Sequence, residues 1–161
     1  MKTIIFVRHG KSSWDYQVDD KDRPLKERGV NDAHLVAGQL KKMEMEIDWC
    51  FSSPANRALH TCMIFLRNLN FDFSKFKVSR DLYDFSGDSV LNFLKNLNGS
   101  YSNVMIFGHN YAFTSLVNML GDAYIDNLPT SGMAILEFNI EGWSGLKRGT
   151  TKQITFPKEL R

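Results

Sequence analysis

The chain has 161 residues, of which 43% are hydrophobic and 24% charged, and its formal net charge is +2. This size and apolar content predict one domain over residues 1–161, whose core needs neither a disulfide nor a structural metal. Charges of both signs are interspersed, so the chain lacks the basic stripe of a nucleic-acid binder. No apolar stretch is long enough to span a membrane, and Arg8 ends the first apolar run too early for a signal peptide. We therefore expect a cytoplasmic monomer without a nucleic-acid or membrane partner, in which Cys50 and Cys62 are buried free thiols.

Strand-like and helix-like segments alternate along most of the chain. Short apolar runs predict buried strands at residues 4–7, 47–51, 76–79 and 104–107. Apolar residues at helical spacing predict helices at residues 29–45, 54–69, 86–97 and 111–120. Ser53 before Pro54 predicts the N-cap and the first residue of the second helix. The segments 133–140 and 146–156 predict an antiparallel C-terminal hairpin, and the whole pattern predicts an α/β protein, a three-layer α/β/α sandwich with a mostly parallel sheet.

A histidine follows each of two predicted strands. Arg8-His9 comes directly after the first strand, and His109 comes after the strand at 104–107. Because ligands bind beyond the carboxyl ends of parallel strands, we expect both histidines at one site. Arg57 lies in the first turn of a predicted helix, where free N–H groups and the helix dipole favour an anion. Alone, Arg8-His9 could be a strand cap and Arg57 a solvated side chain, but together these residues predict a phosphate site.

Three motifs carry a resemblance to a known family: Arg8-His9-Gly10, residues 52–61 (SSPANRALHT) and Gly108-His109-Asn110. They resemble the signature of the histidine phosphatase superfamily, the phosphoglycerate-mutase-like enzymes. Within it, the segments 22–29, 82–83 and 128–132 resemble the short phosphohistidine phosphatase (SixA-like) branch. The resemblance spans nearly the whole chain and implies a phosphoglycerate-mutase-like fold and a hydrolase. We expect no cofactor and a metal-independent reaction, because the four histidines show no metal-ligand spacing.

The resemblance also implies roles for the residues of these motifs. His9 would be the nucleophile that becomes phosphorylated, and Arg8, Arg57 and His109 would surround the phosphoryl oxygens. A histidine nucleophile must be neutral, and nearby guanidinium groups lower a histidine pKa. The arginines that hold phosphate would therefore also keep the nucleophile active.

The sequence predicts the substrate less specifically than it predicts the residues of the site. Asp84 falls where the wider superfamily commonly has a glutamate general acid, but it could equally be an exposed loop aspartate. An imidazole leaving group needs little help from an acid, which favours a phosphohistidine protein as the substrate and phosphate as a product. The short spacing from Arg57 to Asp84 and on to His109 leaves no room for a lid and predicts an open site. A phosphatase for small metabolite phosphomonoesters and a non-catalytic phosphate-binding module are the alternatives.

Overall fold

The computed structural model describes residues 1–161 and contains one six-stranded sheet in the order β3-β2-β4-β1-β5-β6. The strands are β1 (Lys2–Arg8), β2 (Trp49–Ser52), β3 (Phe76–Val78), β4 (Asn103–Gly108), β5 (Met133–Phe138) and β6 (Thr150–Thr155). The helices are α1 (Glu27–Lys42), α2 (Asn56–Asn68), α3 (Asp88–Lys95) and α4 (Ala112–Leu120). Short 3-10 turns include η1 (Asp20–Asp22) and η3 (Arg80–Leu82). None of the helices is long and apolar enough to cross a membrane.

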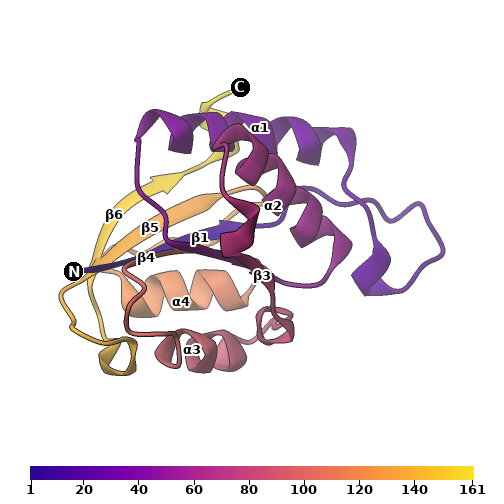
Figure 1. Ribbon diagram of the computed structural model, residues 1–161. Coiled ribbons are helices and arrows are strands. Elements are labelled where there is room, and N and C mark those ends of the chain that lie inside the picture. The colour runs from indigo at the N-terminus through magenta and orange to yellow at the C-terminus, as the bar shows by residue number, and fades with distance from the viewer.

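The sheet is mixed, as the sequence predicts. Strands β3, β2, β4 and β1 are parallel to one another, whereas β5 pairs antiparallel with β1 and with β6. Figure 1 shows α1 and α2 on one face of the sheet and α3 and α4 on the other. The predicted three-layer α/β/α sandwich with an antiparallel C-terminal hairpin is therefore confirmed.

Each face of the sheet has its own hydrophobic core, because side chains alternate between the two faces of a strand. Ile5 and Val7 of β1 pack with α1 and α2, whereas Ile4 and Phe6 pack with α3 and α4. These four side chains are fully buried, as expected for a central strand covered on both sides. Because β1, β4 and β2 are parallel, their carboxyl ends, and the residues that follow them, lie at one rim of the sheet.

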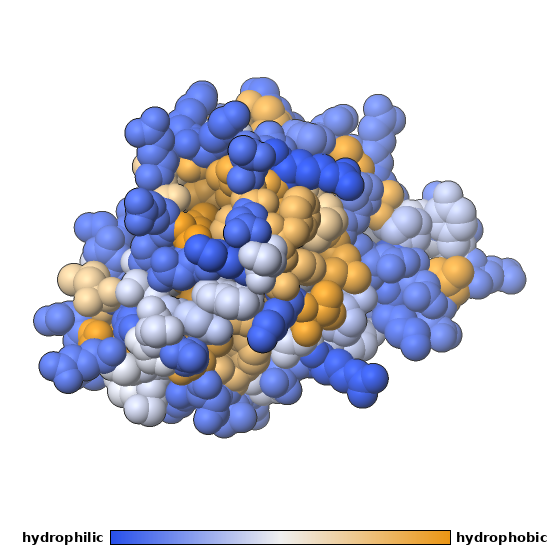
Figure 2. All heavy atoms as spheres, in the orientation of Figure 1, coloured by the Kyte–Doolittle hydropathy of each residue, from blue (hydrophilic) through white to orange (hydrophobic).

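The positions of the two cysteines and the distribution of apolar residues on the surface fit this layered arrangement. Cys50 and Cys62 are buried free thiols, as predicted, with their sulfur atoms 3.6 Å apart between β2 and α2. On the face that Figure 2 shows, hydrophilic residues cover α1, and apolar side chains gather over α2.

Helix α2 begins later than the sequence predicts. Ala55, not Ser53, occupies the N-cap position, and the first helical residue is Asn56. The reason is that the sheet still holds Ser53, whose N–H donates to the carbonyl of Phe107 in β4. The prediction that Ser53 caps the helix with Pro54 as its first residue is therefore wrong, although the Ser53 hydroxyl accepts from the N–H of Ala55 at 3.2 Å, just before the helix.

A long loop, residues 11–26, connects β1 to α1 and projects from the rim of the sheet at the right of Figure 1. Its two ends are joined by an antiparallel bridge between Ser12 and Leu25. Gly29 lies so close to the loop that a Cβ atom there would be 2.3 Å from the Lys11 carbonyl oxygen, so only glycine fits. This close approach anchors the loop, whose η1 turn then reaches back over the start of α2.

Candidate active site

His9 lies at the end of β1 with its ring held in one tautomer. Its backbone N–H donates to the Gly108 carbonyl, which joins the ends of β1 and β4. Its Nδ1 is 2.8 Å from the carbonyl oxygen of Gly10, and a carbonyl only accepts. Nδ1 therefore carries the proton, and the Nε2 lone pair faces Arg57 Nε at 3.4 Å. Only 8% of the residue is exposed, so the unprotonated nitrogen points into a sheltered site.

His109 occupies the matching position after β4, with its ring centroid 5.3 Å from that of His9. Its Nδ1 is 3.5 Å from Arg57 Nη2, and because a guanidinium only donates, Nδ1 accepts. Its Nε2 therefore carries the proton and donates to the Ser53 hydroxyl oxygen at 2.8 Å. Ser53 thus fixes the His109 ring, a contact that the sequence analysis missed because it links residues 56 positions apart.

Arg57 uses the two edges of its guanidinium differently. The inner edge, which consists of Nε and Nη2, faces the two histidines. Nε lies 3.4 Å from His9 Nε2, and Nη2 lies 3.5 Å from His109 Nδ1. The outer edge is held by Asp20, whose carbonyl oxygen accepts from Nη1 at 2.6 Å and whose carboxylate accepts from Nη2 at 2.9 Å. The structure therefore aims the inner edge of a buried guanidinium at the space beside both imidazoles.

Asp20 is a second residue that the sequence analysis missed. Tyr83 donates its hydroxyl hydrogen to the Asp20 carboxylate at 2.7 Å, and Arg23 adds a further ion pair at 3.2 Å. Partial burial raises the pKa of Asp20, but the hydrogen bonds from Tyr83 and Arg57 outweigh it and lower this pKa to about 2. Asp20 is thus a charged anchor for Arg57, and its position in a polar loop gave no signal of this role.

Arg8 contributes a second guanidinium at the end of β1. Its Nη1 donates to the carbonyl oxygen of Leu128 at 2.9 Å, in the loop before β5. Its Nε is buried and has no hydrogen-bond partner. Because a buried donor without a partner costs free energy, this atom is suited to an anionic acceptor.

The two histidines are neutral. Burial, and then the charges of neighbouring residues including Arg57 and Arg8, lower the pKa of both His9 and His109 to about 3. The sequence predicts this direction but attributes it to the guanidinium groups, whereas burial is the larger cause. A neutral imidazole beside two fixed positive charges is the state that a nucleophile requires.

Asp84 does not join this cluster through any hydrogen bond. One carboxylate oxygen accepts from the backbone and hydroxyl of Ser86, and the other accepts from the N–H groups of Gly87 and Val90 at the start of α3. Partial burial opposes ionisation, but these donors lower the pKa of Asp84. The geometry is that of a helix-capping carboxylate, which disfavours the predicted general-acid role.

Aromatic side chains border the cluster on its solvent side. The rings of Tyr83 and Phe85 lie with their centroids 5.3 Å and 4.9 Å from that of His109. Tyr111, two residues after His109, is 65% exposed. Phe113 of α4 instead packs into the core against Phe6.

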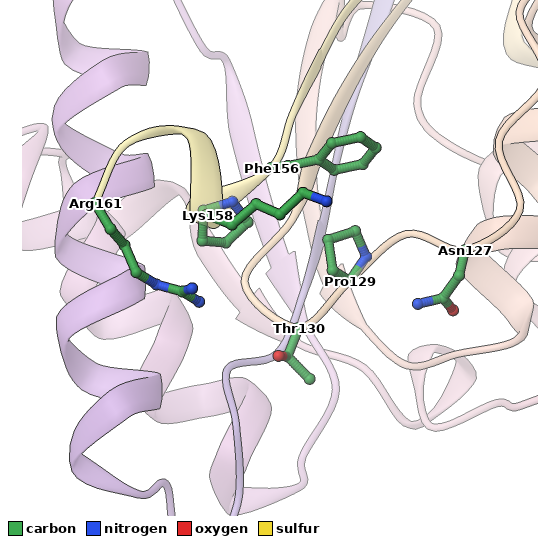
Figure 3. Close-up of a pocket in the computed structure, with 7 residues that line it drawn as sticks. Asn127, Pro129, Thr130, Phe156, Lys158 and Arg161 are labelled. Carbon is green, nitrogen blue, oxygen red and sulfur yellow. The ribbon is translucent and has the colours of Figure 1, made fainter.

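A separate cavity of about 280 Å³ lies between the loop before β5 and the C-terminal segment. Figure 3 shows Lys158 and Arg161 on one side of it, with Asn127 and Pro129 opposite. The Arg161 guanidinium forms a two-bond ion pair with Asp32 of α1 at 2.9 and 2.8 Å. None of the residues of the histidine–arginine cluster lines this cavity, so the candidate active site is the cluster at the strand ends.

The fold and the site together define the class. An α/β sandwich that places two neutral histidines and two arginines at the carboxyl ends of its central strands has the architecture of a phosphoglycerate-mutase-like histidine phosphatase. The family model of the histidine phosphatase superfamily (branch 1) matches residues 4–90, and the chain belongs to this superfamily.

Several proteins resemble the chain over different lengths. An uncharacterized Mycobacterium tuberculosis protein is 26% identical, with 93% of this chain and 98% of that protein covered. A 2,3-bisphosphoglycerate-dependent phosphoglycerate mutase of Actinobacillus pleuropneumoniae is 36% identical over 70 residues, but this region is 42% of this chain and 31% of the mutase.

Solved structures of SixA proteins match almost the whole fold. The protein histidine phosphatase SixA, solved with tungstate, superposes with a TM-score of 0.83 at 27% identity, and 99% of each chain is covered. A proposed phosphohistidine phosphatase SixA from Agrobacterium tumefaciens gives 0.81 at 24% identity, with 97% and 98% covered. The resemblance to the SixA-like branch is thereby confirmed.

Proposed function

We propose that this protein is a phosphatase in which His9 accepts a phosphoryl group and then passes it to water, without a metal ion. The observation that carries the proposal is that the inner edge of Arg57 lies within 3.5 Å of a ring nitrogen of both His9 and His109. Tungstate, the ligand of the similar SixA structure, is a tetrahedral oxyanion like phosphate, which supports an oxyanion site in this fold.

The cluster suits the charge that phosphoryl transfer spreads over the equatorial oxygens. The inner edge of Arg57 and the unpaired Nε of Arg8 supply fixed donors for these oxygens. Since Asp20 already holds the outer edge of Arg57, little reorganisation is needed when the charge develops. Nδ1 of His9 stays protonated on the Gly10 carbonyl while Nε2 attacks phosphorus.

The substrate that fits this chemistry best is a phosphohistidine on another protein. Neither nearby carboxylate is placed to donate a proton, because Asp20 is held by Arg57 and Tyr83, and Asp84 caps α3. A phosphohistidine with a proton on its second ring nitrogen needs no donor: the electron pair of the P–N bond returns to the ring, and a neutral imidazole leaves. In the second step water attacks phosphorus, both of its hydrogens remain with the phosphate, and His9 is released neutral.

A phosphatase for small metabolite phosphomonoesters is the second candidate. The similarity over 70 residues to a phosphoglycerate mutase favours it, because phosphoglycerate is a small phosphomonoester. An alkoxide leaving group, however, needs a proton that the engaged carboxylates are poorly placed to give. We therefore rank phosphohistidine first.

Turnover of a phosphohistidine protein in the presence of EDTA tests the proposal. We expect acid-labile phosphate to be trapped on His9 by rapid denaturation, and His9→Ala to abolish both trapping and turnover. A His60→Ala variant, which changes an exposed histidine on the same helix as Arg57, is the matched control. Phosphate on another residue, or turnover that survives His9→Ala, would refute the nucleophile, and a panel of sugar phosphates would separate the two candidate substrates.

A further inference from the structure

Phe85 lies at the mouth of the site with one half of its surface free. The residue is 48% exposed, although its ring centroid is only 4.9 Å from that of the fully buried His109. Tyr83 supports it at a centroid distance of 5.4 Å in an edge-to-face contact. A large apolar ring that contacts a catalytic-site histidine and still faces solvent is available to a ligand.

The leaving group of the reaction is expected to lie close to the Phe85 ring. In phosphoryl transfer the leaving atom lies opposite the attacking atom, which in this site is His9 Nε2. His9, Arg57 and His109 form the buried floor of the site, whereas Phe85 and Tyr83 border its open side. A leaving group directed away from His9 therefore passes alongside these two aromatic rings.

The charged residues at the open side of the site differ from those near its buried floor. The floor presents Arg8 and Arg57, but the mouth presents the Asp20 carboxylate, whose side chain is 44% exposed and bonded to Tyr83. Because Asp20 offsets the charges of Arg57 and Arg23, the exposed aromatic faces favour a cationic ring through the cation–π interaction. A protonated phosphohistidine joins an anionic phosphoryl group to such a ring, in the order that floor and mouth require.

We infer that Phe85, supported by Tyr83, is a specificity-determining residue on which the imidazole ring of the leaving group stacks. The inference rests on the proposed function and adds to it: the preference for an aromatic nitrogen leaving group resides in the η3–α3 loop, while the histidine–arginine cluster handles any phosphoryl group. The P–N bond of the substrate breaks as the bond from His9 Nε2 to phosphorus forms, and the stacked ring keeps its remaining proton.

The inference is tested with two substrates that contain a P–N bond, of which only one has a ring in its leaving group. They are free phosphohistidine and phosphoramidate, whose leaving group is ammonia. We expect Phe85→Leu to lower kcat/KM for phosphohistidine roughly three- to tenfold relative to phosphoramidate, the range of an aromatic contact. Phe85→Tyr, which keeps an aromatic ring, should leave the ratio of the two kcat/KM values as it is in the unaltered protein. Phe73→Leu is the matched control, because Phe73 is 50% exposed but precedes β3 at the opposite end of the sheet.

The outcomes separate this inference from the proposed function. If Phe85→Leu changes turnover of both substrates equally, or of neither, the stacking role is overturned while the phosphatase stands. If Phe73→Leu shifts the ratio as much as Phe85→Leu, the effect is not local and the role is likewise overturned. If the unaltered protein hydrolyses neither substrate, the proposed function fails and the inference fails with it.

Discussion

At the scale of single residues, Arg57 connects the most groups in the site. Its inner edge faces the nitrogens of His9 and His109, and its outer edge is held by the backbone and carboxylate of Asp20. A guanidinium can do this because its donors lie in one rigid plane. Lysine would keep the positive charge but could not hold Asp20 and face both imidazoles at once.

Arg57→Ala should therefore lower kcat roughly 10²- to 10³-fold, the cost of removing one strong donor to transition-state charge. Arg57→Lys should recover only part of the loss. Steady-state kinetics with phosphohistidine protein measures the effect, and Arg67→Ala on the exposed side of α2 serves as the control. An unchanged kcat/KM in Arg57→Ala would remove this residue from the site.

At the scale of elements, the site depends on where strands end and helices begin. β1 and β4 are adjacent and parallel with Arg8 opposite Gly108, so His9 and His109 follow at the same level of the sheet. Helix α2 starts beside them and brings Arg57 in its first turn. Helix α3 has a different task, since its start is stabilised by Asp84 and positions the loop that carries Phe85.

Because Asp84 binds the free N–H groups at the start of α3, Asp84→Ala should reduce the free energy of unfolding by about 0.5–2 kcal/mol. Turnover of phosphohistidine should fall by no more than the three- to tenfold loss expected from a displaced Phe85, since the Asp84 carboxylate has no part in the proposed transfer. Chemical denaturation and kinetics on the same variant measure the two effects, with Asp81→Ala as an exposed control. A large loss of turnover without a loss of stability would instead restore Asp84 as a general acid.

At the scale of the whole molecule, the two buried histidines make folding depend on pH. In the unfolded chain each takes up a proton near pH 6.5, but in the folded protein only near pH 3. Between these values the unfolded state binds more protons, so stability falls as the pH falls. The same low pKa keeps the nucleophile neutral, so catalysis and acid sensitivity have one cause.

The free energy of unfolding should thus decrease between pH 6.5 and 4.5, by up to about 1.4 kcal/mol per pH unit for each histidine. His9→Asn should remove about half of this slope. Denaturation curves at several pH values provide the measurement. Asp20 complicates only the range below pH 3.8, where its stabilising charge begins to be lost as the pH falls toward its folded pKa of about 2. A flat curve down to pH 4.5 would show that the histidines are charged or exposed.

Local patterns in the sequence predict the order of strands and helices and the meeting of His9, Arg57 and His109 at one site. They can do so because burial periodicity and the residues at strand ends are local signals, read over a few positions. Three contacts become visible only in the folded molecule: Ser53 binds His109, Asp20 binds Arg57 and Tyr83, and Asp84 caps α3.

No local pattern predicts these contacts of Asp20, because the residues that make them lie far apart along the chain. Asp20 is 37 positions from Arg57 and 63 from Tyr83, and no local pattern encodes a hydrogen bond over such distances. The same holds for burial: the guanidinium charges that the sequence reveals are the smaller cause of the low histidine pKa values, and the desolvation that dominates exists only once the layers have packed around the rings.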